Sequence, residues 1–99
     1  MSYSFEVSDS NNKNKKLKVV IYKDGVKVKT LHIGDNRYAD YIQYYRSSPS
    51  IADERRILFL DRHHKENWRN FMKPAFWSRW LLWEKKTLRE AIANINLNR

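Results

Sequence analysis

A chain of 99 residues is long enough for one domain and too short for two. It has no cysteine, which excludes disulfides and thiolate metal sites, and its formal net charge of +9 favours a polyanionic partner. No apolar run approaches the roughly 20 residues that a membrane span needs, and residues 1–7 lack the basic and apolar regions of a signal peptide. We therefore expect an intracellular protein that is neither secreted nor membrane-bound.

The first 15 residues end in a polar stretch without hydrophobic periodicity. Such a segment predicts a mobile N-terminal arm, residues 1–15, ahead of a single domain spanning residues 16–99. Phe5 and Val7 leave open a short edge strand within that arm.

A β-hairpin is predicted by Asp24-Gly25, which lies between the alternating runs 17–22 and 26–33. A two-residue turn places Ile21 opposite Val28, so alternate residues share one face of the hairpin. The core face then holds Leu17, Val19, Ile21, Val26 and Val28, and the outer face holds Lys18, Val20, Tyr22, Lys27 and Lys29.

Two helices are predicted after the hairpin. Tyrosines at helical spacing indicate a short helix over residues 38–45. Ser50 and Asp53 resemble a capping box that begins a helix ending near His63. Its inner stripe is expected to contain Ile51, Leu58 and Phe59.

Two more helices complete the predicted chain. Pro74 suits the first turn of a helix that continues over residues 75–83, with Phe76, Trp80 and Trp83 on one face and Trp77 and Leu81 on the adjacent one. Thr87 and Glu90 form a capping box for a last helix, whose inner stripe is Leu88, Ala91, Ile92 and Ile95. The predicted fold class is α+β, with an N-terminal antiparallel hairpin packed against several short C-terminal helices.

The sequence contains little that indicates catalysis or metal binding. His63 and His64 are adjacent, and neighbouring helical residues diverge by about 100°, so both cannot readily bind one metal. There is no nucleophile elbow, and two glycines cannot build a phosphate-binding loop. We expect no cofactor, no metal site and no enzymatic activity. A nuclease that uses Mg²⁺ or Mn²⁺ with His63 is the least favoured alternative.

All four tryptophans lie between residues 68 and 83, interleaved with cations. We expect Trp80 and Trp83 to pack on the hairpin, since large rings fill a small core efficiently. Arg79 is expected inside the fold, as a cation–π or ion-pair partner. Trp68 lies in a polar context and is the better candidate for stacking on a base.

Cations on the predicted hairpin and helices form the candidate nucleic-acid-binding set, with Tyr22 and Trp68 as stacking rings. An ordinary solvated face, with lysines that discourage strand-to-strand aggregation, is the alternative. Sequence specificity is expected to be weak, because no helix-turn-helix, zinc-finger or RNP-like pattern occurs. The candidate cations are Lys18, Lys27, Lys29, Arg55, Arg56, Arg62, Lys65 and Arg69.

Three segments within residues 17–95 carry a resemblance. They are Gly34-Asp35-x-x-Tyr38-x-Asp40-Tyr41, then Arg55-Arg56-x-Leu58-x-Leu60-x-Arg62-His63 with Glu66-Asn67-Trp68, and Ser78-Arg79-Trp80-Leu81-Leu82-Trp83 with Thr87-Leu88-Arg89-Glu90-Ala91-Ile92. In these the chain resembles a family of small, uncharacterised basic proteins encoded by large DNA viruses of protists and algae. The resemblance implies a viral setting, with genomes and capsids as partners, and it carries over no activity and no site residue.

The leading expectation is a non-enzymatic nucleic-acid-binding or genome-associated accessory protein of a large DNA virus, with DNA favoured over RNA. It would act inside the host cell, in the viral factory, cytoplasm or nucleus, and in the virion. The alternative is a structural adaptor or minor virion protein that binds an acidic protein partner through aromatic and Arg side chains, which protein interfaces favour.

Overall fold

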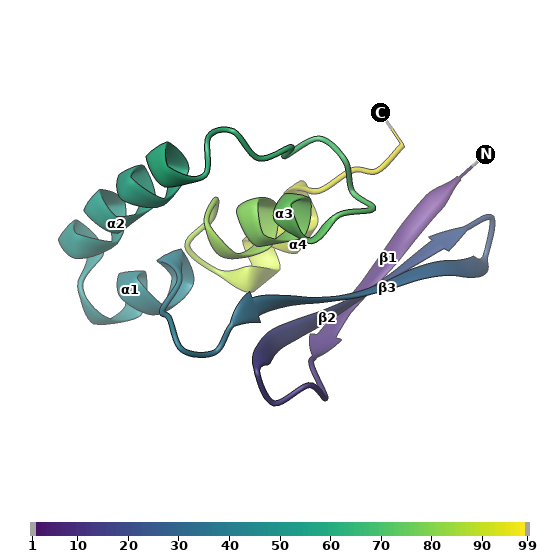
Figure 1. Ribbon diagram of the computed structural model, residues 1–99, viewed down its shortest axis with the longest axis horizontal. Coiled ribbons are helices and arrows are strands. Elements are labelled where there is room, and N and C mark those ends of the chain that lie inside the picture. Colours follow the sequence, from purple (N-terminus) through teal and green to yellow (C-terminus); the bar gives the residue numbers. More distant parts are fainter. Residues whose placement is uncertain (1, 99) are drawn as a thin grey trace.

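A computed structural model describes residues 2–98, which form a three-stranded antiparallel sheet followed by short helices (Figure 1). The α+β class and the hairpin packed against C-terminal helices are thus confirmed. The strands are β1 (Tyr3–Asp9), β2 (Lys15–Lys23) and β3 (Val26–Asp35), and the helices are α1 (Tyr41–Ser47), α2 (Pro49–Arg62), α3 (Pro74–Trp77), the π-helical η1 (Ser78–Leu82) and α4 (Leu88–Asn94).

The N-terminal segment differs from the predicted mobile arm, because β1 pairs with β2 from Tyr3 to Asp9. Side chains alternate across a strand, so Tyr3, Phe5 and Val7 pack against the core while the residues between them face away. The amide of Asn98 adds a second attachment: it accepts a hydrogen bond from the Tyr3 N–H at 2.6 Å and donates one to the Tyr3 carbonyl at 2.8 Å.

The hairpin turn is as predicted, but its register differs by one residue. Asp24 and Gly25 both have positive φ, 51° and 81°, as a tight hairpin turn requires. Beyond the turn, Ile21 pairs with Lys29 instead of Val28, because a β-bulge interrupts the ladder between Ile21 and Tyr22. Val28 is the extra residue on β3.

The bulge exchanges the faces of β3, since one inserted residue moves every later side chain to the other side. Val26 and Val28 are 65% and 45% exposed, while Leu31 and Ile33 are buried on the inner face. Lys29, the partner of Ile21, lies on the helix side of the sheet. The predictions that Val26 and Val28 enter the core and that Lys29 shares the outer face are wrong.

The core lies between the inner face of the sheet and the helical layer formed by α3, η1 and α4 (Figure 1). Trp77 and Leu81 are completely buried there, and the Trp77 indole donates to the carbonyl of Phe71 at 2.6 Å. The predicted burial of Trp80 and Trp83 is only partial. The adjacent helix face, with Trp77 and Leu81, supplies the centre of the core because η1 widens the helix just after Trp77.

Helix α2 begins one residue before the predicted capping box, at Pro49, and the Ser50–Asp53 cap does not form. Asp53 instead accepts a hydrogen bond from the Tyr41 hydroxyl at 2.8 Å. The predicted inner stripe is wrong for Ile51 and Leu58, which are exposed.

Two helix N-termini are capped by side chains. Asp40 begins α1 with a capping box, in which its carboxylate accepts from the Gln43 N–H and the Gln43 side chain accepts from the Asp40 N–H. Thr87 begins α4 by accepting from the Glu90 N–H, at the predicted position. No helix within residues 2–98 is long and apolar enough to span a bilayer.

Candidate nucleic-acid interface

The outer sheet face is the side of the sheet that lies opposite the helices (Figure 1). Cross-strand partners share a face, and the observed register arranges this face in three rows of three. The rows are Ser8, Lys18 and His32, then Glu6, Val20 and Thr30, then Ser4, Tyr22 and Lys27.

The outer sheet face is positively charged. Lys18 and Lys27 lie at opposite ends of it, and no carboxylate forms an ion pair with either within the described chain. Glu6 is its one acidic side chain. Tyr22 lies directly across from Lys27, so a ring and a cation are neighbours. Of the predicted residues, the structure thus places Lys18, Tyr22 and Lys27 on one face, with only Tyr22 and Lys27 side by side, and it places Lys29 on the other face.

The exposed cations of α2 have a different environment. Arg55 and Arg62 are seven residues apart and share one side of the helix, but Glu54 and Asp61, with the same spacing, lie beside them. The Arg55 guanidinium lies 5.7 Å from the centroid of the Tyr44 ring. Because acids alternate with bases here, this surface attracts a polyanion less than the outer sheet face does.

Arg56 is partly buried, and its guanidinium is occupied by contacts within the protein. Its guanidinium forms an ion pair with Glu84 and donates to the Trp83 carbonyl at 2.8 Å. Arg79 binds the other carboxylate oxygen of Glu84 at 3.2 Å. One carboxylate therefore joins α2 to the end of η1 through two arginines.

Arg79 is the more buried of the two arginines that bind Glu84, with 8% exposure. Its guanidinium carbon lies 5.2 Å from the Trp68 ring centroid and 4.5 Å from that of Trp80. Burial lowers the pKa of Arg79, and Glu84 partly offsets that effect. The predicted cation–π and ion-pair role of Arg79 is confirmed.

Trp68 and its neighbours lie on the segment that joins α2 to α3. Trp68 is half-buried, and its Nε1 atom is enclosed without a hydrogen-bond partner among residues 2–98. Its carbonyl accepts a hydrogen bond from Trp80 Nε1 at 2.9 Å. Lys65 and Arg69 are exposed on the same segment, away from the lysines of the outer sheet face.

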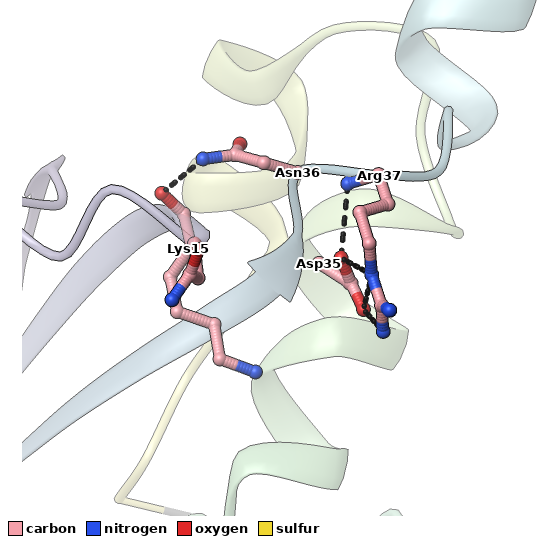
Figure 2. Close-up of a pocket in the computed structure, with 5 residues that line it drawn as sticks. Lys15, Asp35, Asn36 and Arg37 are labelled. Atoms are coloured by element: carbon pink, nitrogen blue, oxygen red, sulfur yellow. Dashed lines mark hydrogen bonds and ion pairs between the residues drawn. The ribbon is translucent and has the colours of Figure 1, made fainter.

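A polar hollow lies where β3 ends, lined by Asn14, Lys15, Asp35, Asn36 and Arg37. Figure 2 shows the Arg37 guanidinium against the Asp35 carboxylate, 2.7 Å at the closest atoms, and the Asn36 amide donating to the Lys15 carbonyl. Hydrogen bonds from Arg37 lower the pKa of Asp35 to about 2. At neutral pH the Asp35 carboxylate therefore stays ionised and paired with Arg37. This hollow is not a site for acid–base chemistry, because its carboxyl group does not change protonation near neutral pH.

The three histidines are separated in the structure. His32 Nδ1 is joined to Ser10 Oγ at 2.7 Å, and His63 Nδ1 to Glu66 at 2.8 Å. Within residues 2–98, no three His, Asp or Glu side chains converge as metal ligands would.

His32 was not among the predicted site residues, although it lies beside Lys18 on the outer sheet face. Its place follows from the register after the bulge. A change of parity in the apolar positions of β3, from Val26 and Val28 to Leu31 and Ile33, is the sequence signal that could have revealed it.

Comparison of the chain with protein-family models, with curated proteins and with solved structures gives no match.

Proposed function

We propose that this small α+β protein is a non-enzymatic nucleic-acid-binding protein that holds phosphates on its outer sheet face with weak sequence specificity. The observation that supports this most is that Lys27 lies beside Tyr22 at one end of a face opposite the helices and Lys18 lies at its other end, both without a paired carboxylate in the described chain. Ammonium groups neutralise phosphates, and a phenol ring stacks on a base or sugar. Such contacts carry little sequence information.

The net charge of +9 gives this proposal its second support. A domain this small with such a charge attracts nucleic acid from a distance and binds it faster at low salt. The viral part of the proposal, a genome-associated protein of a large DNA virus with DNA as its preferred partner, rests on the resemblance of the three quoted segments alone.

A matched pair of lysines on β3 tests the proposal. Lys27 and Lys29 are both exposed and two residues apart, but they lie on opposite faces of the sheet. Lys27→Ala and Lys29→Ala remove the same charge. We expect Lys27→Ala to weaken binding to labelled DNA several-fold and to reduce the salt slope by about 1, as loss of one phosphate contact does. Fluorescence anisotropy across a salt series measures both quantities.

The same experiment can contradict the proposal in two ways. Equal losses in the two variants would mean that overall charge, and not the outer sheet face, determines binding. Absence of micromolar binding to DNA or RNA by the wild-type chain at low salt would remove the nucleic-acid function altogether.

One observation favours the adaptor function as a second candidate. Ile51, Ile57 and Leu58 on α2 are 46%, 65% and 47% exposed, and large apolar side chains gathered on one helix are a common feature of protein interfaces. Binding of a protein partner to this surface should persist at high salt. It should be lost in the double variant Ile57→Glu/Leu58→Glu and retained in Lys27→Ala. Pull-down at high salt from virus-infected host cells, with both variants in parallel, separates the two functions.

A further inference from the structure

A cleft of about 510 Å³ opens on the helical side of the protein, where the segment after α2 meets α3, η1 and residues 94–97. Trp68, Phe71, Phe76 and Trp80 line it with aromatic rings. The cleft is distinct from the outer sheet face, because Phe71 packs against Tyr3 on the inner side of β1, with ring centroids 5.0 Å apart.

The aromatic wall of this cleft is held in place by the fold. Trp80 Nε1 donates to the Trp68 carbonyl at 2.9 Å, and the Arg79 guanidinium lies against both indoles. Glu84 in turn holds Arg79. Because the rings are already ordered, binding of a ligand that stacks on them carries little free-energy cost for fixing their positions.

The rim of the cleft is polar and carries no acidic side chain among its lining residues. Arg69 is an exposed residue of the lining. Asn94, the last residue of α4, is also an exposed lining residue, and its amide makes no hydrogen bond within residues 2–98. Rings suit the face of a planar heterocycle, a carboxamide suits its hydrogen-bonding edge, and a guanidinium suits an adjacent phosphate.

We infer that this cleft accepts one unstacked base of a single-stranded nucleic acid. The aromatic wall contacts the face of the base, Asn94 its edge and Arg69 a neighbouring phosphate. The inference rests on the proposed function and extends it, since the bases of a duplex stay stacked inside the helix and cannot enter. The protein then binds a single strand more tightly than a duplex of equal length.

Two probes of equal charge separate base contacts from phosphate contacts: a thymidine hexanucleotide and an abasic hexamer with the same sugar–phosphate chain. We expect the wild-type protein to bind the thymidine oligomer about tenfold more tightly, as stacking of one base predicts. The indole N–H signals of Trp68 and Trp80 should shift in the NMR spectrum with the thymidine oligomer and not with the abasic one.

A pair of neighbouring positions on α4 locates the effect. Asn94→Trp fills the cleft, whereas Ala93→Trp places the same side chain at an exposed position outside the cleft lining. The tenfold preference for the thymidine oligomer should disappear in Asn94→Trp and persist in Ala93→Trp. Circular dichroism confirms that both variants are folded.

The possible results distinguish this inference from the proposed function. Equal binding of both oligomers by the wild-type chain overturns the base site and leaves phosphate binding intact. Binding of neither oligomer at low salt overturns both. If Asn94→Trp keeps the preference for the thymidine oligomer, the base does not bind in the cleft. If an aromatic peptide shifts the indole N–H signals of Trp68 and Trp80 and the thymidine oligomer does not, the cleft binds a protein segment instead of a base.

Discussion

Glu84 is the single residue on which two buried or partly buried arginines depend. Its two carboxylate oxygens bind Arg56 and Arg79, and the Arg79 side chain also supports the indoles of Trp68 and Trp80. Removal of the negative charge leaves two guanidinium groups without a counter-charge, and such an uncompensated group is more costly than the pair it replaces.

Glu84→Gln should lower the free energy of unfolding by about 2 kcal/mol. This loss is smaller than the loss expected for a fully enclosed ion pair, because the Arg56 side chain is 27% exposed and water screens its charge. Urea denaturation measures the loss. Glu54→Gln on the exposed side of α2 is the matched control and should change stability by less than about 0.5 kcal/mol. Similar losses in the two variants would show that Glu84 contributes no more than a surface carboxylate.

Asp35 provides a test of electrostatics at the end of β3. Its pKa is lowered from 3.8 to about 2, first by the side-chain hydrogen bond from Arg37 and then by the backbone one. Because the folded-state pKa is the lower one, this interaction stabilises the fold above about pH 4, and the stabilisation is lost as the pH falls toward 2.

Arg37→Ala should therefore raise the pKa of Asp35 toward 3.8, but only part of the way, since the backbone N–H of residue 37 remains as a donor. Carboxyl ¹³C NMR titration of both proteins reads the value directly. A pKa unchanged by the substitution would mean that the ion pair does not form in solution.

At the scale of elements, the ends of β3 depend on two glycines with positive φ that differ in their surroundings. Gly25, in the hairpin turn, has no atom within 4 Å of the place that a Cβ would occupy. Gly34, near the end of β3, would put that Cβ 2.9 Å from the Leu82 side chain and 3.1 Å from the Lys16 side chain.

Gly25→Ala should cost about 1 kcal/mol, which is backbone strain alone. Gly34→Ala should cost about 3 kcal/mol, because Leu82 is buried in the core and has no room to move away. Thermal or urea unfolding of the two variants side by side measures the difference. Equal losses would refute the steric contribution of Leu82.

The sequence predicts β2, β3, the hairpin turn and the Thr87 cap because each depends on local chemistry, whereas it predicts a mobile arm where β1 pairs with β2. Strict alternation of faces does not predict the bulge, since the apolar pattern of β3 fits either register until both ends of the strand are considered together. The enclosed position of Arg79 is predicted, but the complete burial of Trp77 and the π-helical η1 that follows it are not, since no propensity encodes such a widening of the helix. The capping box of Asp40 and Gln43 is encoded locally by their three-residue spacing, and it begins α1 three residues after the predicted start at Tyr38.

At the scale of the whole protein, the cations divide into separate groups. Arg56 and Arg79 hold the interior, Arg55 and Arg62 lie among acids, and the outer sheet face keeps its lysines free of ion pairs within the described residues. Composition gives the total charge but not this division, which is why the candidate site from sequence contained ten residues and the structure places only three of them, Lys18, Tyr22 and Lys27, on the outer sheet face.

The division predicts a moderate salt dependence. If about three phosphates are contacted, by Lys18, Lys27 and Arg69, log affinity should fall against log salt concentration with a slope near −2 on single-stranded DNA and near −3 on a duplex. Anisotropy titrations between low and physiological salt measure the slope. A slope steeper than about −6 would require phosphate contacts well beyond the outer sheet face, and one near zero would favour a protein partner.

The hydrogen bonds between Tyr3 and Asn98 bring distant parts of the chain side by side (Figure 1). In a variant limited to residues 3–98, a few glycines from Asn98 to Tyr3 would join the two residues without bending any strand. New ends could then be cut in the exposed turn between β1 and β2, near Lys13, to give a circular permutant with the same topology. This would let a fluorescent tag or surface anchor be attached far from both the aromatic cleft and Asn98.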